Sequence, residues 1–96
     1  MTKEIRTLTA EINALMAEPA APLAQLEDAL TTGYARALEL EAERSRLERR
    51  LGEAAATGDG DGARELAARV SSTDEHLTRL RALLRVLRER ASAARF

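Results

Sequence analysis

Cysteine is absent from the 96-residue chain, and histidine occurs only once, as His76. Without thiols the chain has no disulfide, no thiolate nucleophile and no cysteine-based zinc site, and a single imidazole excludes a site built from several histidines. No phosphate-binding loop, dinucleotide fingerprint or nucleophile elbow occurs in the sequence. We therefore expect no metal, no cofactor and no enzymatic activity.

Long apolar runs and a strong net charge are also missing. The apolar runs are short, against the roughly 20 residues that a helix needs to cross a bilayer. The N-terminal residues alternate between charged and apolar types, which is unlike a signal peptide. A net charge of −1 argues against a dedicated nucleic-acid-binding protein, because such proteins carry a marked basic excess. These features predict a soluble cytoplasmic protein that does not bind membranes.

Aromatic side chains are limited to Tyr34 and Phe96, so leucine, alanine, isoleucine and valine must fill the core. Alanine, glutamate, leucine and arginine dominate the composition, which is typical of coiled coils and long helices. Fourteen arginines stand against the single Lys3, a bias that a GC-rich bacterial genome would produce. A chain of this length holds one small domain with a thin core, so we expect residues 1–96 to form a single helical domain.

Helix-breaking residues occur in two places. Pro19 and Pro22 form the first break, since proline is tolerated only in the first turn of a helix. Three glycines form the second break, and the first of them, Gly58, suits the left-handed position that ends a helix. Asp59 or Asp61 can then cap the next helix. The breaks predict helices over about 2–17, 20–57 and 61–94, with the second helix starting near Pro19 or Pro22.

A seven-residue repeat of mostly apolar side chains runs through all three predicted helices. Such a repeat places these side chains along one seam, where they pack as knobs into the holes of a partner helix. In the first helix the repeat consists of Ile5, Leu8, Ile12 and Leu15. In the second helix it falls at 23, 30, 37, 44 and 51 and at 26, 33, 40, 47 and 54, and in the third at 63, 70, 77, 84 and 91 and at 66, 73, 80, 87 and 94.

The two long helices match each other in one register. In an antiparallel hairpin with a short turn, the numbers of opposing residues have a constant sum. A sum of 117 brings every seam position opposite another one, for example Leu47 opposite Val70, and it centres the turn between Gly58 and Asp59. The sequence therefore predicts an all-α fold built on a long antiparallel two-helix coiled-coil hairpin.

Charged residues that flank the seam support this register with one exception. Each surface ion pair contributes only about 0–1 kcal/mol, but several pairs together oppose slipped registers. The predicted pairs of opposite charge are Glu27 with Arg95 and Glu41 with Arg81, and the like-charged exception is Glu48 opposite Asp74.

The short first helix should pack at the base of the hairpin, the end away from the turn, because the link through Pro19 and Pro22 is short. The turn end, by contrast, has little apolar surface beyond the seam and should project as a two-helix tip. A thin hairpin with apolar flanks buries more surface by dimerising, so we expect a homodimeric helical bundle. The candidate interaction surface consists of Tyr34, Leu38, Leu83 and Val86.

One seam layer is polar, because it places Arg44 opposite Thr73. A guanidinium at a core position is unfavourable unless it is paired. One interpretation is a site for a small anion or nucleotide formed by Arg44, Thr73, Asp74 and His76, since arginine binds phosphate through two parallel hydrogen bonds. The other interpretation, which we favour, is that Arg44 reaches out of the seam to a nearby carboxylate and fixes the register.

Arginines crowd the C-terminal segment. Six arginines and one glutamate give residues 79–95 a local charge of +5, whereas eight acids and three bases give residues 1–43 a charge of −5. A basic stripe can indicate nucleic-acid binding, but no aromatic residues are interleaved for stacking on bases. Charge complementarity within the fold is the favoured explanation of the six residues Arg79, Arg81, Arg85, Arg88, Arg90 and Arg95.

These patterns predict a non-enzymatic helical protein–protein interaction module, such as an adaptor, a small chaperone or a regulator. Its expected partners are a second copy of itself and an unidentified protein. Two alternatives stay open: a ligand-gated regulator that binds a small anion or nucleotide near Arg44, and a nucleic-acid accessory protein that uses the C-terminal arginines. The sequence specifies neither the dimer geometry nor whether the first helix packs on its own chain.

Overall fold

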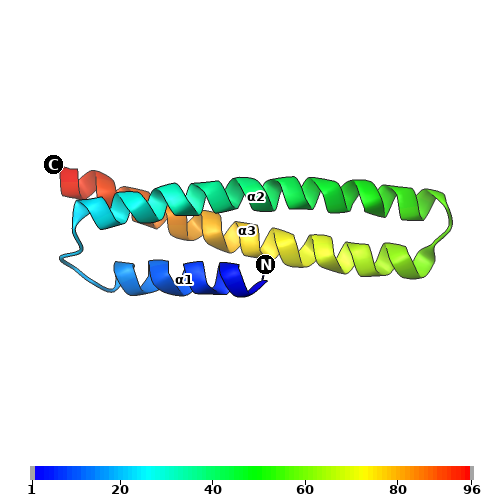
Figure 1. The fold of residues 1–96 in the computed structure, drawn as a ribbon, viewed down its shortest axis with the longest axis horizontal. Coiled ribbons are helices and arrows are strands. Elements are labelled where there is room, and N and C mark those ends of the chain that lie inside the picture. The colour runs from blue at the N-terminus through cyan, green and yellow to red at the C-terminus, as the bar shows by residue number, and fades with distance from the viewer. Residues whose placement is uncertain (1, 96) are drawn as a thin grey trace.

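The computed structural model describes residues 2–95, with side chains from residue 5 onward. This described part is all-helical, with α1 at Thr2–Met16, α2 at Leu23–Ala56 and α3 at Gly60–Arg95. α2 and α3 pack against each other as an antiparallel hairpin, and α1 lies along the half of the hairpin that is far from the turn (Figure 1). The molecule measures 56 × 19 × 15 Å. The predicted all-α helical hairpin is confirmed.

The turn between α2 and α3 is closed by hydrogen bonds that end one helix and begin the next. Gly58 has a φ angle of 78°, in the left-handed region that glycine enters without steric strain. Its N–H donates to the carbonyl of Ala55 at 3.3 Å, and the N–H of Asp59 donates to the carbonyl of Ala54 at 2.9 Å, which are the two bonds of a Schellman motif. Asp59 Oδ1 accepts the N–H of Gly62 at 2.9 Å and so caps α3.

α2 begins at Leu23 rather than near residue 20. Pro22 is its capping residue and has extended backbone angles, with φ −62° and ψ 143°. The carbonyl of Pro22 accepts the N–H groups of Gln25 and Leu26. A residue before proline disfavours the helical conformation, so Ala21 stays outside the helix and α2 starts only after the second proline.

The seam between α2 and α3 follows the predicted layers, and small residues face large ones across it. Gly33 shows this most clearly, because a Cβ atom built there would overlap Leu84 Cδ2 and lie 3.3 Å from Leu84 Cγ. Glycine at this position lets the two helices approach closely around a buried leucine. The buried leucines of the seam are Leu26, Leu30, Leu40 and Leu47 on α2 and Leu66, Leu77, Leu80, Leu84 and Leu87 on α3.

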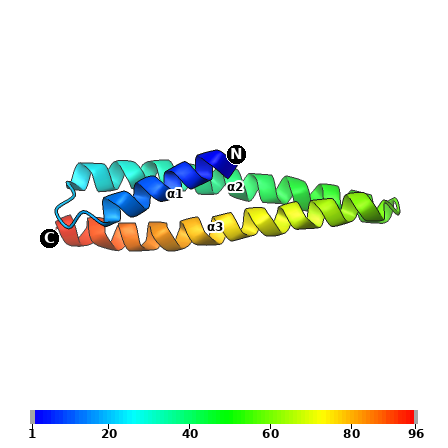
Figure 2. The ribbon, with the colours of Figure 1, turned by 90° about the horizontal axis from the view of Figure 1, so that it is seen from below.

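α1 covers the hairpin on one side, between α2 and α3 (Figure 2). Its inward side chains, Ile5, Leu8 and Ile12, are buried in one cluster with the seam leucines other than Leu47 and Leu66. Leu83 of α3 packs half-buried against that cluster. This covering helix divides the molecule into two regions. We define the base as residues 5–43 and 73–95, where three helices pack, and the tip as residues 44–72, where only α2 and α3 pack.

Arg90 fastens the C-terminal end of α1 to α3. Its Nη1 donates to the carbonyls of Met16 at 2.6 Å and Leu15 at 3.4 Å, and its Nη2 donates to the carbonyl of Glu18 at 2.6 Å. The last carbonyls of a helix have no partner within the helix, and a cation there is further stabilised by the helix dipole. Arg90 therefore supplies a donor to the Met16 carbonyl and a second donor to the carbonyls of Leu15 and Glu18, which already accept the N–H groups of Glu18 and Ala21.

Candidate functional site

The four apolar residues of the candidate interaction surface lie on different sides of the base. Tyr34 and Leu38 lie together on α2, where their exposed fractions are 43% and 66%. Val86 is also exposed, but it does not line the groove that Tyr34 and Leu38 share. Leu83 packs against the buried cluster that includes α1. The structure therefore keeps only Tyr34 and Leu38 together as an exposed apolar pair.

Tyr34 and Leu38 line a groove between α2 and α3, which we call the basic groove. It has a volume of about 390 Å³, and its floor is formed by Ala37 and Leu84. The ion pair between Arg81 and Glu41 spans it. The remaining lining residues are the exposed arginines Arg85 and Arg88.

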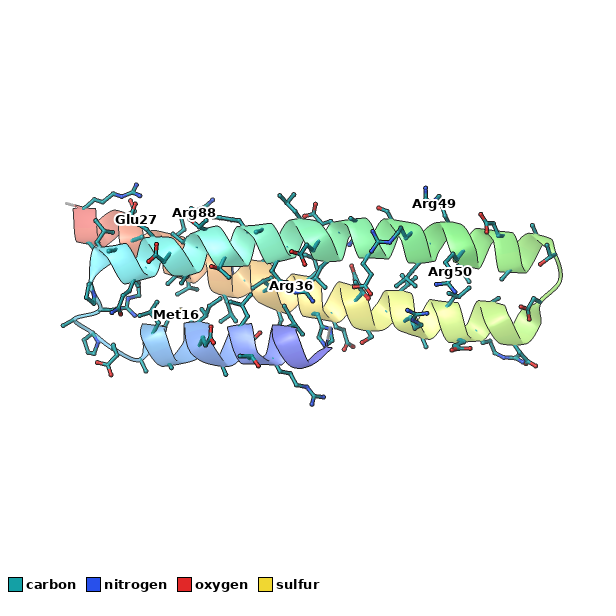
Figure 3. All side chains as sticks on the ribbon, in the orientation of Figure 1. Met16, Glu27, Arg36, Arg49, Arg50 and Arg88 are labelled. Carbon is teal, nitrogen blue, oxygen red and sulfur yellow. The ribbon has the colours of Figure 1, made fainter. Side chains whose placement is uncertain are left out.

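The arginines of the C-terminal segment fall into two groups. Arg81 pairs with Glu41 and Arg95 with Glu27 at 2.7 Å, as the hairpin register predicts, and Arg90 binds backbone carbonyls of the segment that ends α1. The other three arginines have no ion-pair partner among the described residues. These three are Arg79, Arg85 and Arg88, and Figure 3 shows Arg88 on the half of the hairpin that is far from the turn.

The opposite flank of α2 borders a second groove, between α1 and α2, which we call the acidic groove. Its wider part has a volume of about 680 Å³ and is lined by Leu8, Thr32, Ala35 and neighbouring residues. It continues toward the start of α2 as a space of about 330 Å³. The carboxylates that line the two parts belong to Glu11, Asp28 and Glu39. One cation, Arg36, also lines the wider part, where it pairs with Glu39.

The polar seam layer lies where the base meets the tip. Arg44 Nη1 lies 2.7 Å from Asp74 Oδ1, and Arg44 Nε lies 3.7 Å from Glu48 Oε1. The guanidinium thus lies between the two like-charged residues that the hairpin register places opposite each other. Because α1 begins here and does not cover the tip, the Arg44 side chain reaches solvent and is 31% exposed.

The four residues of the candidate anion site therefore point in different directions. Thr73 is buried and His76 half-buried, and both line a cavity of about 220 Å³ under the start of α1, together with Arg36 and Arg69. Arg44 and Asp74 do not line that cavity. The arrangement gives Arg44 two carboxylate partners and does not bring it to His76.

Two contacts beside α1, at Arg36 and Arg90, were not predicted from the sequence. Arg36 is only 8% exposed, lies between α1 and the hairpin (Figure 3), and donates from Nη1 to Glu39 Oε2 at 2.6 Å. Both arginines stand one residue before a seam position, on the flank that α1 covers. The sequence contains a signal for the position of α1. Ala29 and Leu83 lie on the same flank of the seam as Arg36 and Arg90, whereas the opposite flank consists mostly of charged residues.

Within residues 2–95, no group of histidine, cysteine, aspartate or glutamate side chains is arranged to hold a metal ion. None of the described helices is both long enough and apolar enough to span a membrane. Comparison of the chain with protein-family models, with curated proteins and with solved structures finds no match.

Proposed function

We propose that this protein is a non-enzymatic helical interaction module, such as an adaptor, a small chaperone or a regulator, that binds protein partners through its helix faces. The observation that carries this proposal is the exposure of Tyr34 and Leu38, at 43% and 66%, beside a groove in the best-packed part of the molecule. Large apolar side chains gathered in such a groove are typical of protein-binding surfaces. The proposal includes a cytoplasmic location.

The shape of this surface favours a helical partner. The basic groove runs between two helices, and an amphipathic helix fills such a groove with residues spaced by three or four positions. Arg85 and Arg88 line the groove without ion-pair partners among the described residues. A partner that places carboxylates beside its apolar residues would be favoured by the charge of the groove.

The experiment is affinity capture from nuclease-treated lysate of the source organism, with mass spectrometry to identify bound proteins. Wild type is compared with Leu38→Ser, which removes the most exposed apolar side chain of the groove, and with Val86→Ser as a control at an exposed apolar position outside it. We expect a partner, or the untagged chain itself, to be retained by wild type and by the control and lost with Leu38→Ser. Retention of no protein by wild type, or equal retention by all three, would contradict the proposal.

The two alternative functions receive less support from the geometry. Arg44 already has carboxylate partners in Asp74 and Glu48, which leaves it less able to bind an anion. Of the six C-terminal arginines, three are engaged by groups of the chain itself, namely Arg81, Arg90 and Arg95.

A further inference from the structure

We propose that a second copy of this chain covers the outer face of α2. In this dimer the two-fold axis is parallel to α2 and lies between the two copies, so that the two α2 helices are parallel. The inference rests on the proposed function, because it names the partner that covers the Tyr34 and Leu38 surface. It goes beyond that function by specifying the symmetry of the contact and the side chains that face each other.

The outer face of α2 is a ridge between two grooves of opposite charge. Its exposed residues are Thr31, Ala35, Leu38 and Ala42, spaced by three or four positions. Thr31 and Ala35 line the acidic groove, and Leu38 lines the basic groove. Since three of these four side chains are small, a second helix can approach the ridge closely. The spaces of about 390 Å³ and 680 Å³ beside it can take the larger side chains of that helix.

The two grooves carry charges that the chain leaves without ion-pair partners. Glu11 and Asp28 line the acidic side, and Arg85 and Arg88 line the basic side. None of the four has an ion-pair partner among the described residues. A surface with unpaired acids on one flank and unpaired bases on the other is complementary to itself under a suitable rotation.

Symmetry decides which rotation brings opposite charges together. A two-fold axis that is parallel to α2 and lies between the two copies keeps the helix direction and exchanges the two flanks. The basic groove of each copy then faces the acidic groove of the other. A two-fold axis perpendicular to α2 makes the helices antiparallel and places each groove on its own counterpart, acid against acid and base against base. Charge complementarity therefore selects the parallel arrangement.

The charges also match in position along α2. Glu11 shares its groove with Thr32 and Ala35, and Arg88 shares its groove with Tyr34. These contacts place Glu11 and Arg88 within about one helical turn of each other along the axis, and one turn is about 5.4 Å. In the parallel dimer Arg88 of each copy therefore faces Glu11 of the other, on both sides of the Leu38 contact.

The first part of the test measures self-association by sedimentation equilibrium. We expect wild type to be a dimer and Arg88→Glu and Glu11→Arg each to raise the dimer Kd by ~10-fold or more, since each creates two like-charged contacts. An equimolar mixture of the two variants should associate nearly as tightly as wild type, because the mixed dimer restores opposite charges on both flanks. Arg79→Glu, at an exposed arginine that lines neither groove, is the control and should leave Kd unchanged.

The second part tests the direction of the helices. The chain contains no cysteine, so Thr31→Cys and Ala42→Cys each introduce a single thiol on the ridge. In a parallel dimer both positions lie near their own counterparts, and both variants should form intermolecular disulfides under mild oxidation. In an antiparallel dimer only a position on the axis meets its counterpart. Ala82→Cys, at an exposed position of α3, should give no cross-link.

Three results would overturn the inference. Wild type could sediment as a monomer over the whole concentration range, the mixed charge variants could fail to restore association, or only one ridge position could cross-link. All substituted positions are exposed, so the variants should retain their helical circular dichroism. A monomeric wild type would leave the proposed function standing under its own capture experiment, with a different protein on this face.

Discussion

The base and the tip share one coiled-coil seam, but they bury it to different depths. The largest side chains that are completely buried are Ile12, Leu26, Leu77, Leu80, Leu84 and Leu87, all in the base. In the tip Leu47 and Leu66 are buried to a similar degree as several leucines of the base, but Leu51 and Val70 are only half-buried. Two helices alone leave the edges of a seam open to water, whereas a third helix closes one edge. The exposed Tyr34 and Leu38 therefore lie beside the more completely buried part of the core.

The boundary between the two regions coincides with the polar layer. Arg44 and Thr73 lie beside the N-terminal end of α1, and the buried cluster of the base does not include Leu47 or Leu66. Arg36, which is buried deeper in the base, pairs with Glu39, a carboxylate whose own side chain stays mostly exposed. At the boundary Arg44 keeps solvent access and joins Glu48 to Asp74. The polar layer therefore separates the two apolar regions, and we expect its ion pairs to oppose slipped registers of the hairpin.

The sharpest contrast between base and tip should come from shortening one leucine in each. Leu87→Ala leaves a cavity at a position with no exposed surface, and we expect a loss of about 3–5 kcal/mol of unfolding free energy. Leu51→Ala, in the half-buried tip, should lose about 1–2 kcal/mol, because water already reaches the site. Urea unfolding followed by circular dichroism measures both. Equal losses would break the distinction between the two regions.

Removal of the Arg90 side-chain contacts should weaken the base alone. Arg90→Gln is too short to reach the carbonyls of Met16 and Glu18, and the loss of charge-assisted hydrogen bonds costs about 1.5–3 kcal/mol. Hydrogen exchange should show faster exchange throughout α1 and unchanged exchange in the tip. Arg79→Gln, which removes an arginine without an ion-pair partner from the same helix, is the matched control. Slow exchange of α1 in Arg90→Gln would show that the three bonds do not hold the helix.

Two glycines of α2 give a matched pair, one in each region. Gly33→Ala places a methyl group against buried Leu84, and overpacking of this kind destabilises by about 1–3 kcal/mol, only partly offset by the better helix propensity of alanine. At Gly52 in the tip a Cβ meets nothing within 4 Å, so Gly52→Ala should stabilise the protein by about 0.5–1 kcal/mol. Thermal unfolding of the two variants should therefore shift in opposite directions. Stabilisation by both would contradict the close approach at Gly33.

The smallest effect is expected at the boundary itself. Arg44→Leu removes two partly exposed ion pairs, which contribute little, and adds an apolar side chain to the seam, so the unfolding free energy should change by less than about 1 kcal/mol. Urea unfolding of this variant beside wild type measures the change. A loss above about 2 kcal/mol would mean that the polar layer contributes far more to stability than its exposure allows.

The hairpin could be predicted because its rules are local and periodic. The repeat of seven fixes the seam, and the constant sum fixes the register from glycines in the turn to leucines at the base. The pairs Glu41–Arg81 and Glu27–Arg95 follow from the same arithmetic, and the structure contains both. The start of α2 at Leu23 follows from Pro22 and its effect on the preceding residue, a local rule that favours the second of the two prolines as the start.

The position of α1 could not be predicted as securely, because its contacts cross the chain between distant segments. The capping of α1 by Arg90 depends on which side of the hairpin α1 takes, and the repeat alone is compatible with either. For the same reason Tyr34, Leu38, Leu83 and Val86 were grouped by their distance along the hairpin, whereas their angular positions separate them. The two flanks of the seam differ, since one has the apolar residues Ala29 and Leu83 and the other is mostly charged. This difference indicates the flank on which α1 packs.

The most direct test of the division into base and tip is native-state hydrogen exchange of the intact protein, resolved along the chain. We expect the amides of residues 77–91 to exchange only through global unfolding and those of residues 47–70 to exchange at least ~10-fold faster through local opening, because the tip lacks a third helix. Uniform protection along α2 and α3, or slower exchange in the tip than in the base, would contradict the account.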